Sequence, residues 1–217
     1  MVFGVNYTVP KMIKDTVAKY SVVYAQYKRL PNNEFEPITY RDMFQYGMDF
    51  GAALISIGVK KEDKIGLISD KRAEWQQADI GIMAIGAIDV PRGCDATIID
   101  LEKILSITEA QIVIAENNSQ VRKILSLKDK LPALKTFICF ENDVKPETAD
   151  LAKQNGVEIK YFTEMLQIGQ KWRIENKGKV EELMEEGKAD DVVTIIFTSG
   201  TTGDPKGVVL THNNFLA

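Results

Sequence analysis

The sequence is poor in the residues that usually build metal centres and disulfide frameworks. Its 217 residues include two cysteines, Cys94 and Cys139, and one histidine, His212. The cysteines lie far apart, so we expect reduced thiols in a cytoplasmic protein rather than a disulfide framework. No zinc-ligand spacing exists among these three residues, and the sequence therefore predicts no metal site of that kind.

Long hydrophobic runs are also missing. The longest apolar stretch, residues 80–88, is much shorter than the roughly 20 residues that a membrane-spanning helix needs. Residues 1–10 lack the basic start and apolar core of a secretory signal. These features predict a soluble protein, with peripheral membrane contact left open.

Positive charge is not in excess either. The formal net charge is −4, which argues against non-specific binding to nucleic acid, because that binding usually needs a basic surface. Hydrophobic residues make up 45% of the chain and charged residues 27%, which is ordinary for a soluble globular protein.

Predicted strands alternate with predicted helices along most of the chain. The expected strands are residues 35–38, 64–69, 87–91, 111–115, 136–140, 157–162 and 192–197. The expected helices are residues 10–30, 39–57, 70–86, 97–107, 119–127, 148–155 and a broken helical region over 163–187. The pattern predicts an α/β fold with a mostly parallel sheet and helices on both faces. We expect one incomplete α/β domain over 1–217, with an accessory segment over 1–38 and the core over 39–217.

The chemically informative stretch follows the last expected strand. Residues 198–207 read TSGTTGDPKG, which combines three glycines, four hydroxyl side chains and Lys206. Glycines let the backbone approach a ligand closely, and exposed N–H groups in such a turn form an anion site. The composition therefore suits a polyphosphate. A flexible Gly/Ser/Thr linker is the plain alternative, but a linker needs neither the strand before it nor Pro-Lys-Gly at its end.

This stretch does not fit the P-loop pattern of nucleotide hydrolases. That pattern requires Ser or Thr directly after the lysine, whereas Gly207 follows Lys206 here. Residues 198–212 instead closely resemble the AMP-binding signature of the adenylate-forming superfamily, which includes acyl-CoA synthetases and adenylation domains. Residues 70–75 and 86–93 are similar to segments of the long-chain fatty acyl-CoA synthetase branch.

The resemblance implies a fatty acid–CoA ligase that activates a carboxylate with ATP, with Mg²⁺ present, and transfers the acyl group to coenzyme A. It implies that Thr198 begins the phosphate contact and that Lys206 neutralises the leaving pyrophosphate. The residues implied to cradle the β- and γ-phosphates are Ser199, Gly200, Thr201, Thr202 and Gly203. The lone His212 tempts assignment as a base, but we expect it to order the turn into a final helix.

The similarity covers only the amino-terminal part of a family member. The adenine, ribose and catalytic-lysine motifs of the family have no counterpart in this sequence, so we expect an incomplete enzyme that needs a missing carboxy-terminal half or a homo-oligomer. Fatty acid and ATP are the expected small-molecule partners. An adenylating enzyme for aryl or amino acids, and a non-catalytic nucleotide-binding or assembly module, remain alternatives.

Overall fold

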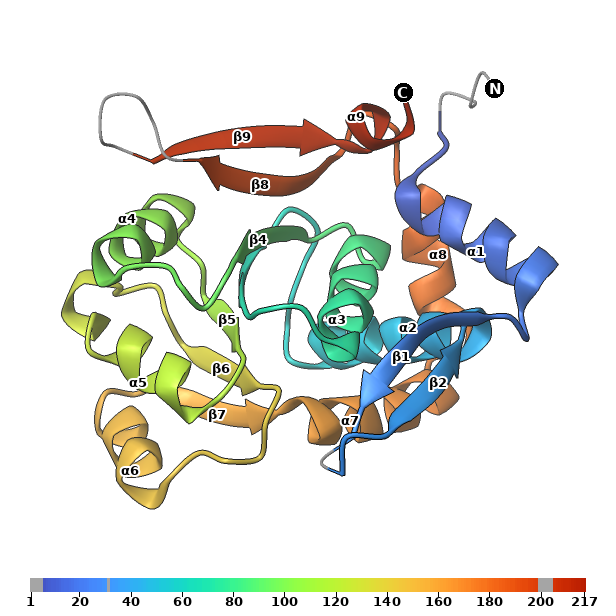
Figure 1. Cartoon of the computed structure of the whole chain (residues 1–217). Helices are drawn as coiled ribbons and strands as arrows, with labels where there is room; N and C mark the ends of the chain where they lie inside the picture. The colour runs from blue at the N-terminus through green and yellow to red at the C-terminus, as the bar shows by residue number, and fades with distance from the viewer. Residues whose placement is uncertain (1–5, 31, 199–204) are drawn as a thin grey trace.

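A computed structural model describes residues 6–30, 32–198 and 205–217 of the chain (Figure 1). Its strands are β1 Tyr24–Arg29, β2 Phe35–Thr39, β3 Lys64–Ile68, β4 Ile88–Arg92, β5 Ile112–Ala115, β6 Thr136–Cys139, β7 Glu158–Tyr161, β8 Val192–Thr198 and β9 Lys206–Thr211. Its helices are α1 Val9–Tyr20, α2 Tyr40–Ser56, α3 Ala73–Ala84, α4 Ile98–Thr108, α5 Asn118–Leu125, the short 3₁₀ helix η1 Lys128–Lys130, α6 Pro146–Gln154, α7 Phe162–Glu175, α8 Lys179–Glu186 and α9 His212–Leu216.

The main sheet has seven strands in the order β7-β6-β5-β3-β4-β8-β9. All neighbouring pairs are parallel except β8 and β9, which form an antiparallel hairpin (Figure 1). The predicted α/β fold with a mostly parallel sheet is therefore confirmed. A separate two-stranded sheet is formed by β1 and β2.

Helices cover both faces of the sheet, and the strand residues alternate between the two cores. On β3, Leu67 belongs to the cluster shared with α2, α3 and α7, whereas Ile68 belongs to the cluster shared with α4 and α5. On β5, Ile114 likewise belongs to the first of these clusters and Val113 to the second. This period of two is what a strand buried on both faces requires.

Thr39 and Thr97 are each followed three residues later by an aspartate, a spacing that predicts a capping box at a helix start, and the structure confirms both helix starts. The Thr97 hydroxyl accepts the Asp100 N–H while the Asp100 carboxylate accepts the Thr97 N–H, so both halves of the predicted capping box form. The Thr39 side chain accepts the Asp42 N–H in the same manner at the start of α2. Gly58 closes the region after α2 with a φ of 94°, which glycine adopts without strain.

The predicted helix over residues 10–30 is wrong in its second half. The helix ends at Tyr20, and β1 begins at Tyr24. An irregularity in the β1–β2 register between Tyr24 and Gln26 adds one residue. Tyr24 and Tyr27 consequently make an edge-to-face contact with ring centroids 5.9 Å apart, although they are three residues apart. A bulged strand can therefore imitate helical spacing.

The break expected within the helical region over 163–187 lies between α7 and α8, around Gly178, which has a φ of 79°. Two smaller boundaries differ from expectation. The helix predicted from residue 70 begins at Ala73. The strand predicted over 87–91 spans Ile88–Arg92, so Arg92 is the last residue of β4. The last of these places Arg92 at the carboxyl edge of the sheet, where ligands of open α/β sheets bind.

Candidate functional site

The base of the signature loop lies at the carboxyl edge of the parallel strands. Thr198 is the last residue of β8 and pairs in register with Lys206, the first residue of β9. Both residues are exposed. The expected phosphate-cradling residues Ser199, Gly200, Thr201, Thr202 and Gly203 lie outside the described part of the chain. The described structure thus brings together the two ends of the loop, one carrying a hydroxyl and the other an ammonium group.

Lys206 has no ion-pair partner among the described residues. It is exposed at the start of a strand that pairs with β8. A lysine ammonium group for which no described carboxylate competes is suited to meet an anion.

A large cavity opens beside the loop base at the same edge of the sheet. Its volume is about 990 Å³, and it lies between the start of α3 and the ends of β3, β4 and β8. Apolar walls come from Trp75, Pro91, Ile196 and Phe197. Trp75 also packs against the main core, so it has a structural role as well as a place on the cavity wall. A cavity with apolar walls and a few polar groups is the usual form of a small-molecule site.

Two arginines on this cavity are held very differently. Arg72 forms ion pairs with Glu74 at 3.0 Å and with Glu141 at 3.1 Å, and its guanidinium lies 5.2 Å from the centre of the Phe140 ring. Arg92 makes a single long contact of 4.0 Å with Asp100, and its buried Nε has no hydrogen-bond partner among the described residues. The Arg72 guanidinium is therefore neutralised within the protein, whereas the Arg92 guanidinium still has N–H groups that can donate hydrogen bonds to a ligand.

The carboxyl edge also gathers Asp70, Cys94 and Glu116, whose ligand atoms lie within 4.8 Å of one another. Sequence spacing did not reveal this cluster, because it joins the ends of three different strands. Glu116 accepts hydrogen bonds from the Ser69 hydroxyl and the Asp70 N–H, both at 2.8 Å. Burial, with the nearby Glu116 carboxylate, raises the pKa of the Cys94 thiol to about 11. The protonated thiol and the occupied carboxylates favour a structural junction over a metal site.

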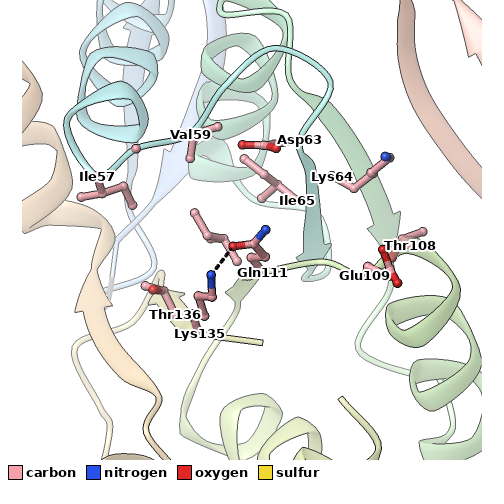
Figure 2. A pocket seen from close by; sticks show the side chains of 12 residues that line it. Ile57, Val59, Asp63, Lys64, Ile65, Thr108, Glu109, Gln111, Lys135 and Thr136 are labelled. Atoms are coloured by element: carbon pink, nitrogen blue, oxygen red, sulfur yellow. Dashed lines mark hydrogen bonds between the residues drawn. The ribbon is translucent and has the colours of Figure 1, made fainter. Parts of the chain in front are cut away.

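A second, smaller cavity of about 210 Å³ lies at the opposite edge of the sheet, where the parallel strands begin (Figure 2). Polar side chains from several elements surround it, and Lys135 donates a hydrogen bond of 2.8 Å to Gln111 there. Ligands of open α/β sheets bind at the carboxyl ends of strands. The cavity beside the loop is therefore the better candidate site, although the smaller one is more enclosed.

His212 occupies a structural position at the end of the hairpin. It is 4% exposed, begins α9, and accepts a hydrogen bond of 3.3 Å from the Val9 N–H at Nδ1. Burial lowers the pKa of His212 to about 4, so the neutral ring that can accept this bond persists at neutral pH. This agrees with the expected ordering role and shows in addition that the ring ties the hairpin to α1.

The chain matches the AMP-binding enzyme family over residues 14–217. It therefore belongs to this family of adenylate-forming enzymes, as the resemblance of residues 198–212 implied.

Relatives include a probable acyl-activating enzyme 16 of Arabidopsis thaliana, 32% identical over 96% of this chain and 29% of that protein. A long-chain-fatty-acid–[acyl-carrier-protein] ligase of the same plant is 32% identical over 82% of this chain and 25% of that protein. A long-chain-fatty-acid–CoA ligase of Xenopus laevis is 26% identical over 95% of this chain and 26% of that protein. The chain thus spans between a quarter and a third of the length of these relatives.

A solved structure supports the fold. The adenylation domain of a carboxylate reductase from Mycobacterium chelonae superposes with a TM-score of 0.75 at 15% identity, over 95% of this chain and 34% of that one. No helix within the described residues combines the length and hydrophobicity needed to cross a membrane.

Proposed function

We propose that this chain forms the phosphate-binding part of a long-chain fatty acid–CoA ligase, which makes an acyl-adenylate from ATP and then a thioester. One observation carries the proposal. The family signature begins at the end of β8 and continues into β9. Thr198 and Lys206 pair across the base of its loop, at the carboxyl edge of the sheet. The fatty-acid ligases among the relatives support the choice of substrate.

Like charge is the main obstacle to the first step. A carboxylate must approach the anionic triphosphate, and two unit charges about 4 Å apart repel by ~1 kcal/mol in water and ~4 kcal/mol at an effective dielectric of 20. Lys206 supplies a positive charge that has no ion-pair partner among the described residues, at the base of the loop where the phosphates would lie. We infer that it screens this repulsion and stabilises the charge on the departing pyrophosphate.

The implied Mg²⁺ does not fit the carboxylates that the described residues offer at this edge. Mg²⁺ prefers hard oxygen ligands in octahedral geometry. Asp70 and Glu116 already accept backbone N–H groups, and the third member of their cluster is the sulfur of Cys94. We therefore assign no residue of this cluster to the ion and derive no step through it.

The proposal is tested with the variant Lys206→Gln and the matched control Lys153→Gln. Lys153 is an exposed lysine on α6, far from the loop in the sheet order. Fatty-acid-dependent exchange of labelled pyrophosphate into ATP is measured with the product of the whole reading frame. We expect Lys206→Gln to slow exchange by ~10²–10³, because a donor aimed at transition-state charge has this effect, and Lys153→Gln to leave it unchanged.

Two results would count against the proposal. Equal exchange rates in Lys206→Gln and wild type would remove Lys206 from the reaction. Exchange supported by aryl or amino acids but not by fatty acids would move the enzyme to another branch of the family. ATP binding to the 217-residue chain, measured by calorimetry, separates loss of binding from loss of chemistry.

The acceptor of the acyl group has a second candidate. The ligase that uses acyl carrier protein is 32% identical to this chain, whereas the CoA ligase is 26% identical. An acyl carrier protein presents the same kind of thiol as coenzyme A, so both fit the second step. Supplying preformed acyl-adenylate with each thiol in turn, and measuring thioester formation, decides between them.

We also propose that the hairpin is covered in the working protein. Val208, Val209 and Phe215 are 44%, 55% and 54% exposed, and an exposed apolar surface of this kind favours association. For the 217-residue chain alone we expect self-association. A strictly monomeric mass in light scattering would contradict this expectation.

A further inference from the structure

A second cation stands level with the base of the signature loop, on the neighbouring strand. The strands β4 and β8 are parallel neighbours, and Asp89 pairs in register with Thr194. Arg92 and Phe197 each lie three residues further along their strands, so they reach the carboxyl edge at the same level, and both line the large cavity. Thr198, which begins the loop, is the next residue of β8. Arg92 therefore lies beside the point where the signature loop leaves the sheet.

Arg92 and Lys206 approach this point from opposite faces of the sheet. Val90, two residues before Arg92, packs with Phe197 against α4, and Figure 1 shows α4 on the side of the hairpin where β8 ends. Side chains two apart in a strand share a face, so Arg92 lies on the α4 face. Lys206 pairs with Thr198, the neighbour of Phe197, and so belongs to the other face. An anion held by the loop would have one cation on each side.

The charge of Arg92 is only weakly matched inside the protein. Its ion-pair contact among the described residues is a long one of 4.0 Å, to Asp100 at the start of α4. Asp100 already accepts the Thr97 hydroxyl at 2.9 Å and the Thr97 N–H at 3.2 Å. These two bonds, the hydroxyl first, hold the pKa of Asp100 below its usual range, and the charge of Arg92 adds less. The buried Nε of Arg92 has no described partner either, so this guanidinium can still receive an anion.

The backbone that follows Arg92 is fixed on both sides. The Cys94 N–H donates to the Asp70 carboxylate at 3.0 Å. The Lys123 ammonium group donates to the carbonyl oxygens of Cys94 at 2.9 Å and Ala96 at 3.1 Å. Lys123 is thus a cation with a structural role, whereas Arg92 is a cation on a fixed strand end with donors to spare. A group that is held in place before a ligand arrives loses less conformational entropy on binding.

We propose that Arg92 binds a phosphate group of the nucleotide, on the side of the signature loop opposite Lys206. The inference rests on the proposed function and adds β4 to the phosphate site. Arginine suits this role because its guanidinium offers two parallel N–H groups to phosphate oxygens, whereas lysine acts as a point charge. Two cations on two strands also suit a triphosphate better than one, because the ligand carries several negative charges.

Calorimetry of inorganic pyrophosphate binding to the 217-residue chain tests this role. The variants are Arg92→Gln and Arg92→Lys, with Arg122→Gln as the matched control on the exposed face of α5. We expect Arg92→Gln to raise the Kd about 10- to 100-fold, because a hydrogen bond to a charged group contributes in this range. Arg92→Lys should recover part of the loss, since it keeps the charge but not the paired N–H groups. Arg122→Gln should bind as wild type does.

A purely structural role for Arg92 predicts a different pattern. If the guanidinium only held α4 through Asp100, Asp100→Asn would weaken pyrophosphate binding as much as Arg92→Gln does, and this result would overturn the inference. Asparagine keeps an oxygen for the helix cap but removes the charge that competes for Arg92. We therefore expect Asp100→Asn to bind pyrophosphate at least as tightly as wild type.

A footprint of the wild-type chain keeps the inference testable if Arg92→Gln fails to fold. Phenylglyoxal modifies accessible arginine side chains, and mass spectrometry locates the modified residues. Saturating pyrophosphate should slow modification of Arg92 by fivefold or more and leave that of Arg122 unchanged. Equal modification of Arg92 with and without pyrophosphate would overturn the inference. So would slowing by palmitate but not by pyrophosphate, which would make Arg92 the partner of a fatty-acid carboxylate.

The inference and the proposed function fail in different experiments. If the product of the whole reading frame exchanges pyrophosphate with fatty acids, but Arg92→Gln binds pyrophosphate as tightly as wild type, the inference alone is wrong. If pyrophosphate protects Arg92 but no fatty acid supports exchange, the proposed function is wrong and the phosphate contact of Arg92 stands. A wild-type chain that binds no pyrophosphate would overturn the inference.

Discussion

The parallel part of the sheet and the β8–β9 hairpin are held to the protein in different ways. Strands β7, β6, β5, β3 and β4 pair over four or five residues each, and β6, β5 and β3 supply buried residues to two large hydrophobic clusters. The hairpin meets β4 through one register pair and is packed by two small clusters, around Val193 and around Phe197. The parallel part is thus a rigid scaffold, and the segment bearing the signature loop is a separately anchored arm.

The largest expected effect compares two buried phenylalanines, one in each region. Phe50 is fully buried and contacts Phe162 with ring centroids 4.8 Å apart, whereas Phe197 is 6% exposed in a small cluster. We expect Phe50→Ala to lower the free energy of unfolding by about 3–5 kcal/mol, as large-to-small changes in cores do. Phe197→Ala should cost less globally and should speed hydrogen exchange mainly in β8 and β9. Equal global losses in denaturant titrations would show that the arm is part of the scaffold.

The next effect concerns the close contact of α2 and α7. A Cβ at Gly169 would lie 1.7 Å from the Asp49 carbonyl oxygen, so the two helices must separate to admit even alanine. We expect Gly169→Ala to cost about 3 kcal/mol, at the upper end of the usual overpacking range. Gly187→Ala is the control, because its Cβ would meet only ordinary or slightly tight neighbours, at 3.2 Å and beyond. A wild-type melting temperature for Gly169→Ala would mean that the helices pack less tightly than described.

Much of the scaffold could be predicted because its signals are local. Short apolar runs marked the strands, and residue pairs such as Thr97 and Asp100 marked helix starts. The helix contact at Gly169 could not be predicted, because it depends on a residue in α2 more than a hundred positions away. The bulge at Tyr24 led to the wrong prediction of a helix, because one extra residue in the strand places Tyr24 and Tyr27 at a spacing typical of a helix.

The candidate site was predictable only in part, for the same reason. Residues 198–207 are contiguous, so composition and resemblance together predicted a phosphate-binding loop. Arg92, Asp70 and Glu116 lie at the ends of different strands, and only the strand order β5-β3-β4-β8 brings them to one edge. The buried position of Asp89 opposite Thr194 likewise depends on a pairing between residues far apart in the sequence.

A smaller effect tests a polar contact inside the scaffold. Asp49 is 1% exposed and is bound by Arg173 at 2.6 Å and by Gln45 at 2.8 Å, while its second oxygen has no described partner. Arg173→Met leaves a buried carboxylate without its cation, and we expect a loss of about 2–3 kcal/mol at pH 7, discounted because Arg173 is partly exposed. Lys179→Met breaks an exposed ion pair with Glu182 at 3.0 Å, and we expect no measurable change in the free energy of unfolding. Equal losses in the two variants would contradict the distinction.

The smallest effect tests the second anchor of the arm, His212. Burial, with help from Lys11 and Lys61, lowers its pKa to about 4, while Asp191 opposes the shift. The unfolded chain has a pKa near 6.5, so it binds more protons than the folded chain between about pH 4 and pH 6.5. The contribution of His212 is therefore present above pH 6.5 and is lost as the pH falls through that window.

His212→Asn retains an acceptor for the Val9 N–H but does not titrate there. In denaturant titrations, we expect its stability relative to wild type to rise by about 1 kcal/mol or more between pH 6.5 and pH 4.5. Hydrogen exchange should show the change mainly at amides at the end of β9 and the start of α1, because the His212 ring joins these two elements. A stability difference that is constant with pH would mean that His212 titrates normally in the folded protein. The arm would then be anchored by the cluster around Val193 and by the β4 junction, without a pH-dependent contact to α1.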